Sequence, residues 1–283
     1  MKNLNKYSGD AFEEFSNALK RKKDPISKAK LEKIENQVKD AYDQYYTNFK
    51  SNSLHLQSSS QLFSDNKNEL QSLYEYQNKV ICSIKNNIKS QQIQSIRTTC
   101  QNCTINSVES MDHILPQSKY PELAINAYNL FPCCSKCNEY KNKKESTATI
   151  QEFLNLYLDK LPDVQYLFVD IFISNGELDF QYYLDNSSKK ISSHFYSIIY
   201  NHYSNLHLLD RMQDSARTYL SDFISSIKPH YKRNPKEYVI ETTLEDIEED
   251  RLAYGYNYWK CSLKLALLNS KIFWDHLDTI IIR

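Results

Sequence analysis

Apolar residues recur every three or four positions over long stretches of this chain, which is the spacing of one face of an α-helix. One such stripe over residues 26–49 predicts a long helix, and another over 69–90 predicts a second helix. The intervening residues 51–68 are rich in serine, glutamine and asparagine, which favours a loop. The N-terminal region is therefore predicted to be helical.

The second half of the chain combines one pair of strands with further helices. Residues 166–173 and 177–184 are rich in β-branched and aromatic side chains, and the Asn175-Gly176 dipeptide between them predicts a tight hairpin turn. Helical spacing returns in three places, residues 195–206, 212–227 and 259–277. We therefore predict a mainly α chain with an additional β-hairpin, α+β overall.

Four of the 7 cysteines form two C-x-x-C pairs, Cys100 with Cys103 and Cys134 with Cys137. Two such pairs can supply four thiolates to one tetrahedral zinc ion. Because sulfur would then fill all four positions, water and substrate are excluded, and we expect the zinc to be structural. The other cysteines lie outside this spacing and are predicted not to bind metal: Cys82, Cys133 and Cys261.

Asp112 and His113 lie between the two cysteine pairs, and Asn138 directly follows the last cysteine. Closing the pairs around one ion draws these three side chains into one neighbourhood. Carboxylate and amide oxygens suit Mg²⁺ or Mn²⁺, and a neutral imidazole is a natural base for activating water near pH 7. The segment therefore predicts a second, catalytic metal site.

The order C-x-x-C, D-H-I-x-P, N-L-x-P-x-C-x-x-C-N-x-x-K, within residues 98–145, closely resembles the HNH endonucleases of the ββα-metal class in their four-cysteine zinc-bound form. The resemblance implies a hairpin and a helix that grip one divalent ion. Asp112 and Asn138 would bind this ion, His113 would be the general base, and Asn129 would orient His113 and its loop. Asn138 stands where the family's nominal last residue is histidine, a variant that the family also uses, and its amide oxygen favours Mg²⁺ or Mn²⁺.

A short helix is predicted after the second cysteine pair. Ser135 is a good candidate for its N-cap, and the helix would carry Asn138 and Lys141 on one side. Beside a nuclease-like motif, Lys141, Lys143 and Lys144 are predicted to form a basic patch that contacts the phosphate backbone of nucleic acid.

These patterns predict three regions along the chain: an N-terminal helical region over 1–95, an HNH ββα-metal module with structural zinc over 96–150, and a C-terminal β-hairpin plus helical region over 151–283. The resemblance implies a metal-dependent endonuclease that hydrolyses DNA, with RNA left open. The alternative is a zinc-stabilised scaffold that binds nucleic acid or docks a protein without catalysis. A scaffold needs only the cysteines, so the accompanying Asp, His and Asn residues favour the enzyme.

Composition narrows the possible partners. The chain has 3 glycines among 283 residues, where usage of about 7% would give about 20, and it has no glycine-rich nucleotide-binding motif. HNH proteins with helical additions resemble nuclease subunits of bacterial anti-phage defence systems, some of which work beside an ATPase. Because this chain has no P-loop, any such ATPase is expected to be a separate protein.

Charge and hydropathy add two further expectations. The 35 basic and 35 acidic residues give no overall field, so affinity for nucleic acid must come from local lysines, a metal ion or a partner. No apolar run reaches the length of a membrane helix, and the start of the chain lacks the pattern of a signal peptide. We therefore expect a cytoplasmic protein without a membrane partner.

Overall fold

The computed structural model describes residues 1–75, 77–142 and 144–282. Helices make up 55% of the chain and strands 9%, and the strands form two small antiparallel sheets of two strands each. The predicted mainly α character is therefore confirmed. Among the described residues, none of the helices is both long and apolar enough to cross a membrane.

The chain divides into two units. The N-terminal unit comprises residues 3–102 and 106–160, and the C-terminal unit comprises residues 1–2, 103–105 and those from 161 onward. The N-terminal unit thus unites the N-terminal helices with most of the cysteine-containing segment, which the sequence analysis assigns to separate regions.

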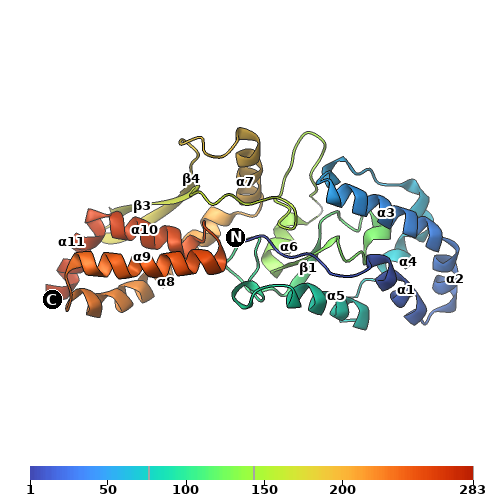
Figure 1. The fold of residues 1–283 in the computed structure, drawn as a ribbon, viewed down its shortest axis with the longest axis horizontal. Coiled ribbons are helices and arrows are strands. Elements are labelled where there is room, and N and C mark those ends of the chain that lie inside the picture. Colours follow the sequence, from blue (N-terminus) through green and yellow to red (C-terminus); the bar gives the residue numbers. More distant parts are fainter. Residues whose placement is uncertain (76, 143, 283) are drawn as a thin grey trace. The chain divides into compact units, whose positions relative to one another are not determined.

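Three helices of the N-terminal unit begin at a polar side chain that caps the first turn. Asp10, Asp24 and Asn78 each accept a hydrogen bond from a backbone N–H of the first turn, which satisfies a donor that has no partner within the helix. Figure 1 shows the α-helices of residues 1–95 in blue and green. They are α1 Ala11–Arg21, α2 Pro25–Lys33, α3 Glu35–Lys50, α4 Lys67–Gln71 and α5 Lys79–Ser90. The 3₁₀ turns of this region are η1 Leu54–Leu56, η2 Gln61–Asn66 and η3 Gln94–Ile96.

The predicted helix over 26–49 is interrupted at Ile34, where φ is −109° and ψ is 8°. The apolar stripe itself is confirmed, because Leu31 and Val38 on either side of the break are both fully buried. The break lets α2 contact α4, where Lys30 forms a 2.6 Å ion pair with Glu69. No glycine or proline marks the break, so only packing reveals it.

Two other predictions for this region are also wrong in part. The predicted helix over 69–90 is divided into α4 and α5, and residues 72–75 and 77–78 between them are not helical. The predicted loop over 51–68 contains η1 and η2, and each of these turns anchors one side chain in the core, Leu54 and Phe63. Buried anchors of this kind fix an otherwise polar segment.

A small hairpin and one helix follow these helices in the N-terminal unit. Strands β1 Ser110–His113 and β2 Leu130–Cys133 pair antiparallel, with His113 opposite Leu130, and η4 Pro121–Leu123 lies in the loop between them. Helix α6 Ser135–Lys141 comes next and contacts β1. Helix α3 also reaches this region, because the Tyr45 hydroxyl donates a hydrogen bond to the Tyr128 carbonyl at 3.2 Å.

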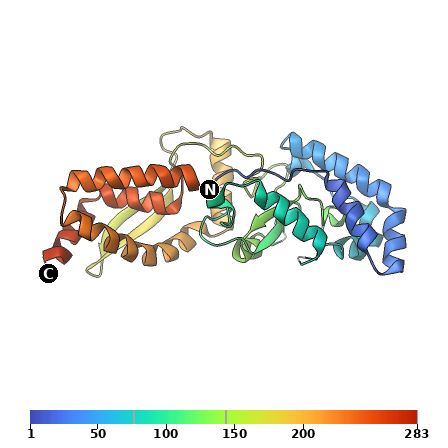
Figure 2. The ribbon, with the colours of Figure 1, turned by 60° about the horizontal axis from the view of Figure 1, so that its bottom comes forward.

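The C-terminal unit is built on the second hairpin, as the sequence predicts. Strands β3 Leu167–Ser174 and β4 Glu177–Leu184 pair antiparallel, and both turn residues have positive φ, 52° at Asn175 and 83° at Gly176. Helices α8, α10 and α11 contact this hairpin (Figure 2). The helices of the unit are α7 Ser193–Asn205, α8 Leu208–Tyr231, α9 Lys236–Tyr254, α10 Trp259–Asn269 and α11 Lys271–Ile282.

Two features of these helices differ from the sequence prediction. The stripe over 259–277 is divided at Ser270, whose extended backbone separates α10 from α11. Helix α9 is not predicted at all, because it buries only Val239, Thr243 and Ile247 and is otherwise rich in acidic residues. Three buried positions spaced by four give too narrow a stripe to be recognised from sequence.

A single buried amide holds the start of β3. The Asn257 side-chain oxygen accepts hydrogen bonds from the backbone N–H groups of Tyr166 and Leu167, at 2.8 and 3.1 Å. Its amide nitrogen donates to the Val164 carbonyl at 2.9 Å. Asn257 is 4% exposed, so water does not replace these partners.

We expect Asn257→Ala to lower the free energy of unfolding of the C-terminal unit by about 3 kcal/mol, because it leaves buried backbone groups unpaired. Urea denaturation followed by circular dichroism measures the loss. The matched control is Asn269→Ala at the exposed end of α10, which should change the stability by about 0.5 kcal/mol or less. Equal losses in the two variants would contradict this role of Asn257.

Candidate active site

The second cysteine pair begins helix α6. Cys134 is the N-cap, and its sulfur accepts a hydrogen bond from the Cys137 backbone N–H at 3.4 Å. The prediction that Ser135 caps this helix is therefore wrong. Ser135 is the first residue of α6, and its hydroxyl instead donates to a Glu109 carboxylate oxygen at 2.9 Å.

The four cysteines of the two C-x-x-C pairs come together. The sulfurs of Cys100, Cys103, Cys134 and Cys137 all lie within 4.8 Å of one another, and all four residues are buried. A tetrahedral zinc ion with bonds of about 2.3 Å to sulfur needs sulfur–sulfur separations of about 3.8 Å, which this spacing allows. The cluster could therefore bind a metal such as zinc.

Cys133 directly precedes Cys134 in sequence but does not belong to this cluster. Its sulfur lies 3.2 Å from the Ser110 hydroxyl oxygen on the paired strand. Burial raises the pKa of the Cys133 thiol, which disfavours the thiolate form that metals bind. The two adjacent cysteines thus differ. Cys134 is a candidate metal ligand, whereas Cys133 is a buried thiol that contacts Ser110.

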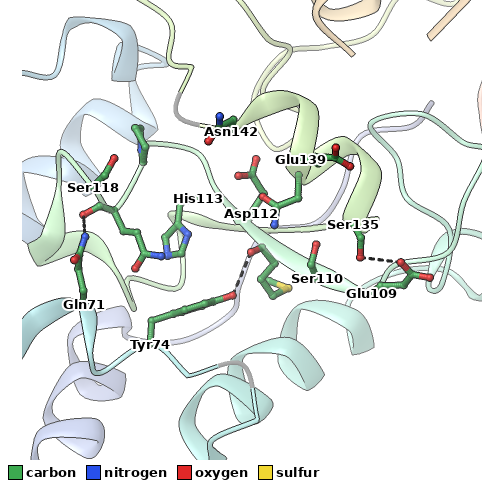
Figure 3. Close-up of a pocket in the computed structure, with 14 residues that line it drawn as sticks. Gln71, Tyr74, Glu109, Ser110, Asp112, His113, Ser118, Ser135, Glu139 and Asn142 are labelled. Atoms are coloured by element: carbon green, nitrogen blue, oxygen red, sulfur yellow. Dashed lines mark hydrogen bonds between the residues drawn. The ribbon is translucent and has the colours of Figure 1, made fainter. Parts of the chain in front are cut away.

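A cleft of about 970 Å³ opens beside this hairpin, entirely within the N-terminal unit. Asp112 and His113 at the end of β1 line it together with Asn138 of α6, and Tyr74 and Gln71 line it from the segment at the end of α4 (Figure 3). The structure therefore brings the three residues predicted to act at the metal to one open site. It adds two residues from outside the predicted module.

The His113 ring has a defined tautomer. It is 8% exposed, and its Nε2 lies 2.8 Å from the Ala124 carbonyl oxygen. A carbonyl oxygen only accepts hydrogen bonds, so Nε2 carries the proton and Nδ1 of the neutral ring has a free lone pair. Burial lowers the pKa of His113, against smaller opposing effects of the Ala124 hydrogen bond and the Asp112 carboxylate. The ring is thereby kept in the form that can accept a proton.

Asp112 is buried and paired with a lysine. The Lys141 ammonium lies 2.8 Å from a carboxylate oxygen of Asp112, and both side chains are 8% exposed. The ammonium also donates to the carbonyl oxygen of His113 and, at 3.4 Å, to that of Ile114. Lys141 thus joins α6 to the end of β1, whereas the sequence analysis interprets it as part of an open basic patch. A buried carboxylate needs a cation nearby, which explains the difference.

Lys143 and Lys144 are the other two members of the predicted basic patch. Lys144 is exposed, and Lys143 lies outside the described residues. Lys136 forms a 3.1 Å ion pair with Glu139 on the surface of α6. The charged residues that line the described part of the cleft, apart from His113, are carboxylates: Glu109, Asp112 and Glu139.

Asn129 is fully buried at the end of the loop that joins the two strands, directly before β2. Its side-chain oxygen accepts a hydrogen bond from the Leu115 backbone N–H at 2.8 Å, and its amide nitrogen donates to the carbonyls of Leu115 and Leu123 at 3.0 and 3.2 Å. These contacts fix Leu115, two residues after His113, and Leu123, directly before Ala124. Its position agrees with the supporting role that the sequence analysis expects.

Sequence reasoning did not identify Tyr74 and Gln71 as site residues. Both residues lie in the stretch 69–90, whose pattern predicted one continuous helix. A continuous helix would have no break between Gln71 and Lys79. Asn78 is the signal that could have found them, because an asparagine followed by an apolar run is typical of a helix start. Comparisons of the chain with protein-family models, curated proteins and solved structures gave no match.

The cysteine cluster makes a direct prediction about metal content. We expect Cys134→Ser to lower bound zinc from about one ion per chain to nearly none and to reduce stability, because metal binding contributes directly to folding. Elemental analysis and thermal unfolding of the purified protein measure both effects. Cys133→Ser is the matched control and should retain its zinc. Loss of zinc from both variants, or from neither, would contradict the assignment of the ligands.

Glu122 is a buried acid in η4. It lies two residues before Ala124, whose carbonyl oxygen contacts the His113 ring. It is 4% exposed, and its Oε2 has no hydrogen-bond partner among the described residues. Burial raises the pKa of Glu122 from 4.5 to about 7. The folded protein therefore holds this proton more tightly than the unfolded chain. Its stabilising effect is complete below pH 4.5 and is lost as the pH rises through 7.

We expect Glu122→Gln to stabilise the protein at pH 8, by up to about 3 kcal/mol, and to have little effect at pH 4.5, because glutamine carries no charge to bury. Urea denaturation at the two pH values measures the difference. Glu32→Gln, at an exposed position of α2, is the control and should show no such pH dependence. A gain at pH 8 no greater than at pH 4.5 would contradict the raised pKa.

Proposed function

We propose that the chain is a divalent-metal-dependent endonuclease of the HNH type that hydrolyses phosphodiester bonds of DNA. The observation that carries this proposal is the joint placement of Asp112, His113 and Asn138 on one cleft, with Nδ1 of the His113 ring able to accept a proton. A hairpin followed by a short helix supplies all three, in the order that the sequence resemblance implies.

Asp112 and Asn138 would hold the catalytic Mg²⁺ or Mn²⁺. Both offer oxygen ligands, which these hard cations prefer, and both line the same cleft. The ion would share the Asp112 carboxylate with the Lys141 ammonium, which contacts one of its oxygens. When bound, the ion would neutralise charge on the scissile phosphate and on the leaving 3′ oxygen.

His113 would act as the general base. Its Nδ1 would take a proton from water as the water oxygen attacks phosphorus, and the bond from phosphorus to the 3′ oxygen would break. The 3′ oxygen then takes a proton from solvent, which leaves a 5′ phosphate and a 3′ hydroxyl. The hydrogen bond of Nε2 to the Ala124 carbonyl supports this role, because it stabilises the ring as its positive charge develops.

The charge of the cleft makes the metal ion important for binding as well as for chemistry. The lining carboxylates of Glu109 and Glu139 would repel a phosphate group. A divalent ion at Asp112 would offset that repulsion, with exposed Lys144 as a candidate backbone contact nearby in sequence. The preference for DNA and a role in anti-phage defence rest on the sequence resemblance alone.

We expect purified protein to cut supercoiled plasmid when Mg²⁺ or Mn²⁺ is added, and His113→Ala to lower the cleavage rate by about 10²–10⁴-fold while keeping its zinc. Single-stranded DNA and RNA are tested in parallel to define the substrate. His194→Ala, at an exposed position of α7, is the matched control and should cut at the wild-type rate.

Two outcomes would contradict this proposal. Cleavage by His113→Ala at the wild-type rate would show that another group activates the water. Binding of DNA without cleavage under any metal condition would instead support the alternative function, a zinc-stabilised scaffold.

A further inference from the structure

Tyr74 contacts the His113 ring from outside the predicted nuclease module. It lies in the non-helical segment between α4 and α5, within the N-terminal unit. The ring centroids of Tyr74 and His113 are 4.7 Å apart, and their planes meet at 65°, an edge-to-face arrangement (Figure 3). Aromatic pairs favour this geometry because the positive edge of one ring meets the negative face of the other.

Two hydrogen bonds hold the segment that carries Tyr74 against the hairpin. The Tyr74 hydroxyl donates to the Met111 carbonyl of β1 at 3.2 Å, two residues before His113. The Gln71 amide donates to the Gln117 carbonyl, on the loop that leaves β1, at 2.7 Å. Figure 3 shows both bonds as dashed lines. Tyr74 is thereby fixed to the same strand end as the histidine that it contacts.

The contact with Tyr74 bears on the orientation of the His113 ring plane. The hydrogen bond from Nε2 to the Ala124 carbonyl fixes one atom of the ring but leaves the ring plane able to tilt about that bond. A proton acceptor must point at the attacking water within narrow limits of angle, so the ring plane also has to be fixed. Tyr74 packs beside the ring and can supply this restraint.

We infer that Tyr74 is a positioning residue for His113. It acts through the histidine ring and takes no part in the proton transfer. This inference rests on the proposed function and deepens it, because it makes the N-terminal helical region part of the active site. It also accounts for the interruption between α4 and α5, since Tyr74 lies outside both helices where it lines the cleft.

The test compares Tyr74→Leu and Tyr74→Phe with the wild-type protein. We expect Tyr74→Leu to lower kcat for DNA cleavage about 3–10-fold with little change in KM, because the ring contact is lost while the surface that binds DNA is kept. Tyr74→Phe keeps the ring and should restore kcat to within about twofold. The matched control is Tyr46→Leu, a half-buried tyrosine of α3 that packs on Tyr128 and should leave kcat unchanged.

A second measurement does not depend on catalysis. Nitrogen-15 spectra of the His113 ring, recorded on the zinc-bound protein without added Mg²⁺ or Mn²⁺, separate a protonated Nε2 from an unprotonated Nδ1. We expect this separation in the wild-type protein and in Tyr74→Phe, and partial averaging in Tyr74→Leu. If Tyr74→Leu does not fold, as judged by circular dichroism and zinc content, Tyr74→Met replaces it with a side chain that fills similar apolar space.

Wild-type kcat and an unchanged His113 spectrum in the leucine or methionine variant would overturn the inference. A loss of kcat that Tyr74→Phe does not restore would also overturn it, because the hydroxyl and not the ring would then be responsible. If the wild-type protein shows no cleavage at all, the proposed function fails. The His113 spectra then still decide whether Tyr74 orients the ring.

Discussion

The rest of the candidate site depends on the buried amide of Asn129. A side-chain amide can accept two hydrogen bonds and donate two, and Asn129 uses this full capacity: it accepts from the Leu115 N–H and the Tyr45 hydroxyl, and it donates to the carbonyls of Leu115 and Leu123. These bonds tie helix α3 and both arms of the loop to one point. The loop that meets the His113 ring is fixed as a result, although it contains little regular structure.

The second organising feature is the charge on Asp112. A buried carboxylate is costly unless a cation lies beside it, and the Lys141 ammonium meets this need in the structure. A divalent ion bound to the same carboxylate would meet the same need. The need to compensate this buried charge is the electrostatic cause of the observed ion pair. This cause also explains why a lysine on a short, otherwise polar helix is buried.

Local patterns predicted much of the secondary structure. Apart from the missed helix α9, the main errors fall where the backbone interrupts a predicted helix. The Asn175-Gly176 turn was predictable because positive φ is costly for most residues and these two tolerate it. The breaks at Ile34 and Ser270 were not, because the apolar stripe continues across each of them. A stripe records which side chains are buried, and it does not record whether the backbone between them stays helical.

The sequence by itself determined the chemistry available to this protein: four thiols in two pairs, with a carboxylate, an imidazole and an amide between and after them. Residue type and spacing along one short segment are enough for that. Only the tertiary structure decided the electrostatics and the orientation of the site, through the pairing of Lys141 with Asp112 and the packing of Tyr74 on His113. The Tyr74 contact joins segments far apart in the chain, and burial of the ion pair depends on how β1 and α6 pack, so no local pattern could specify either.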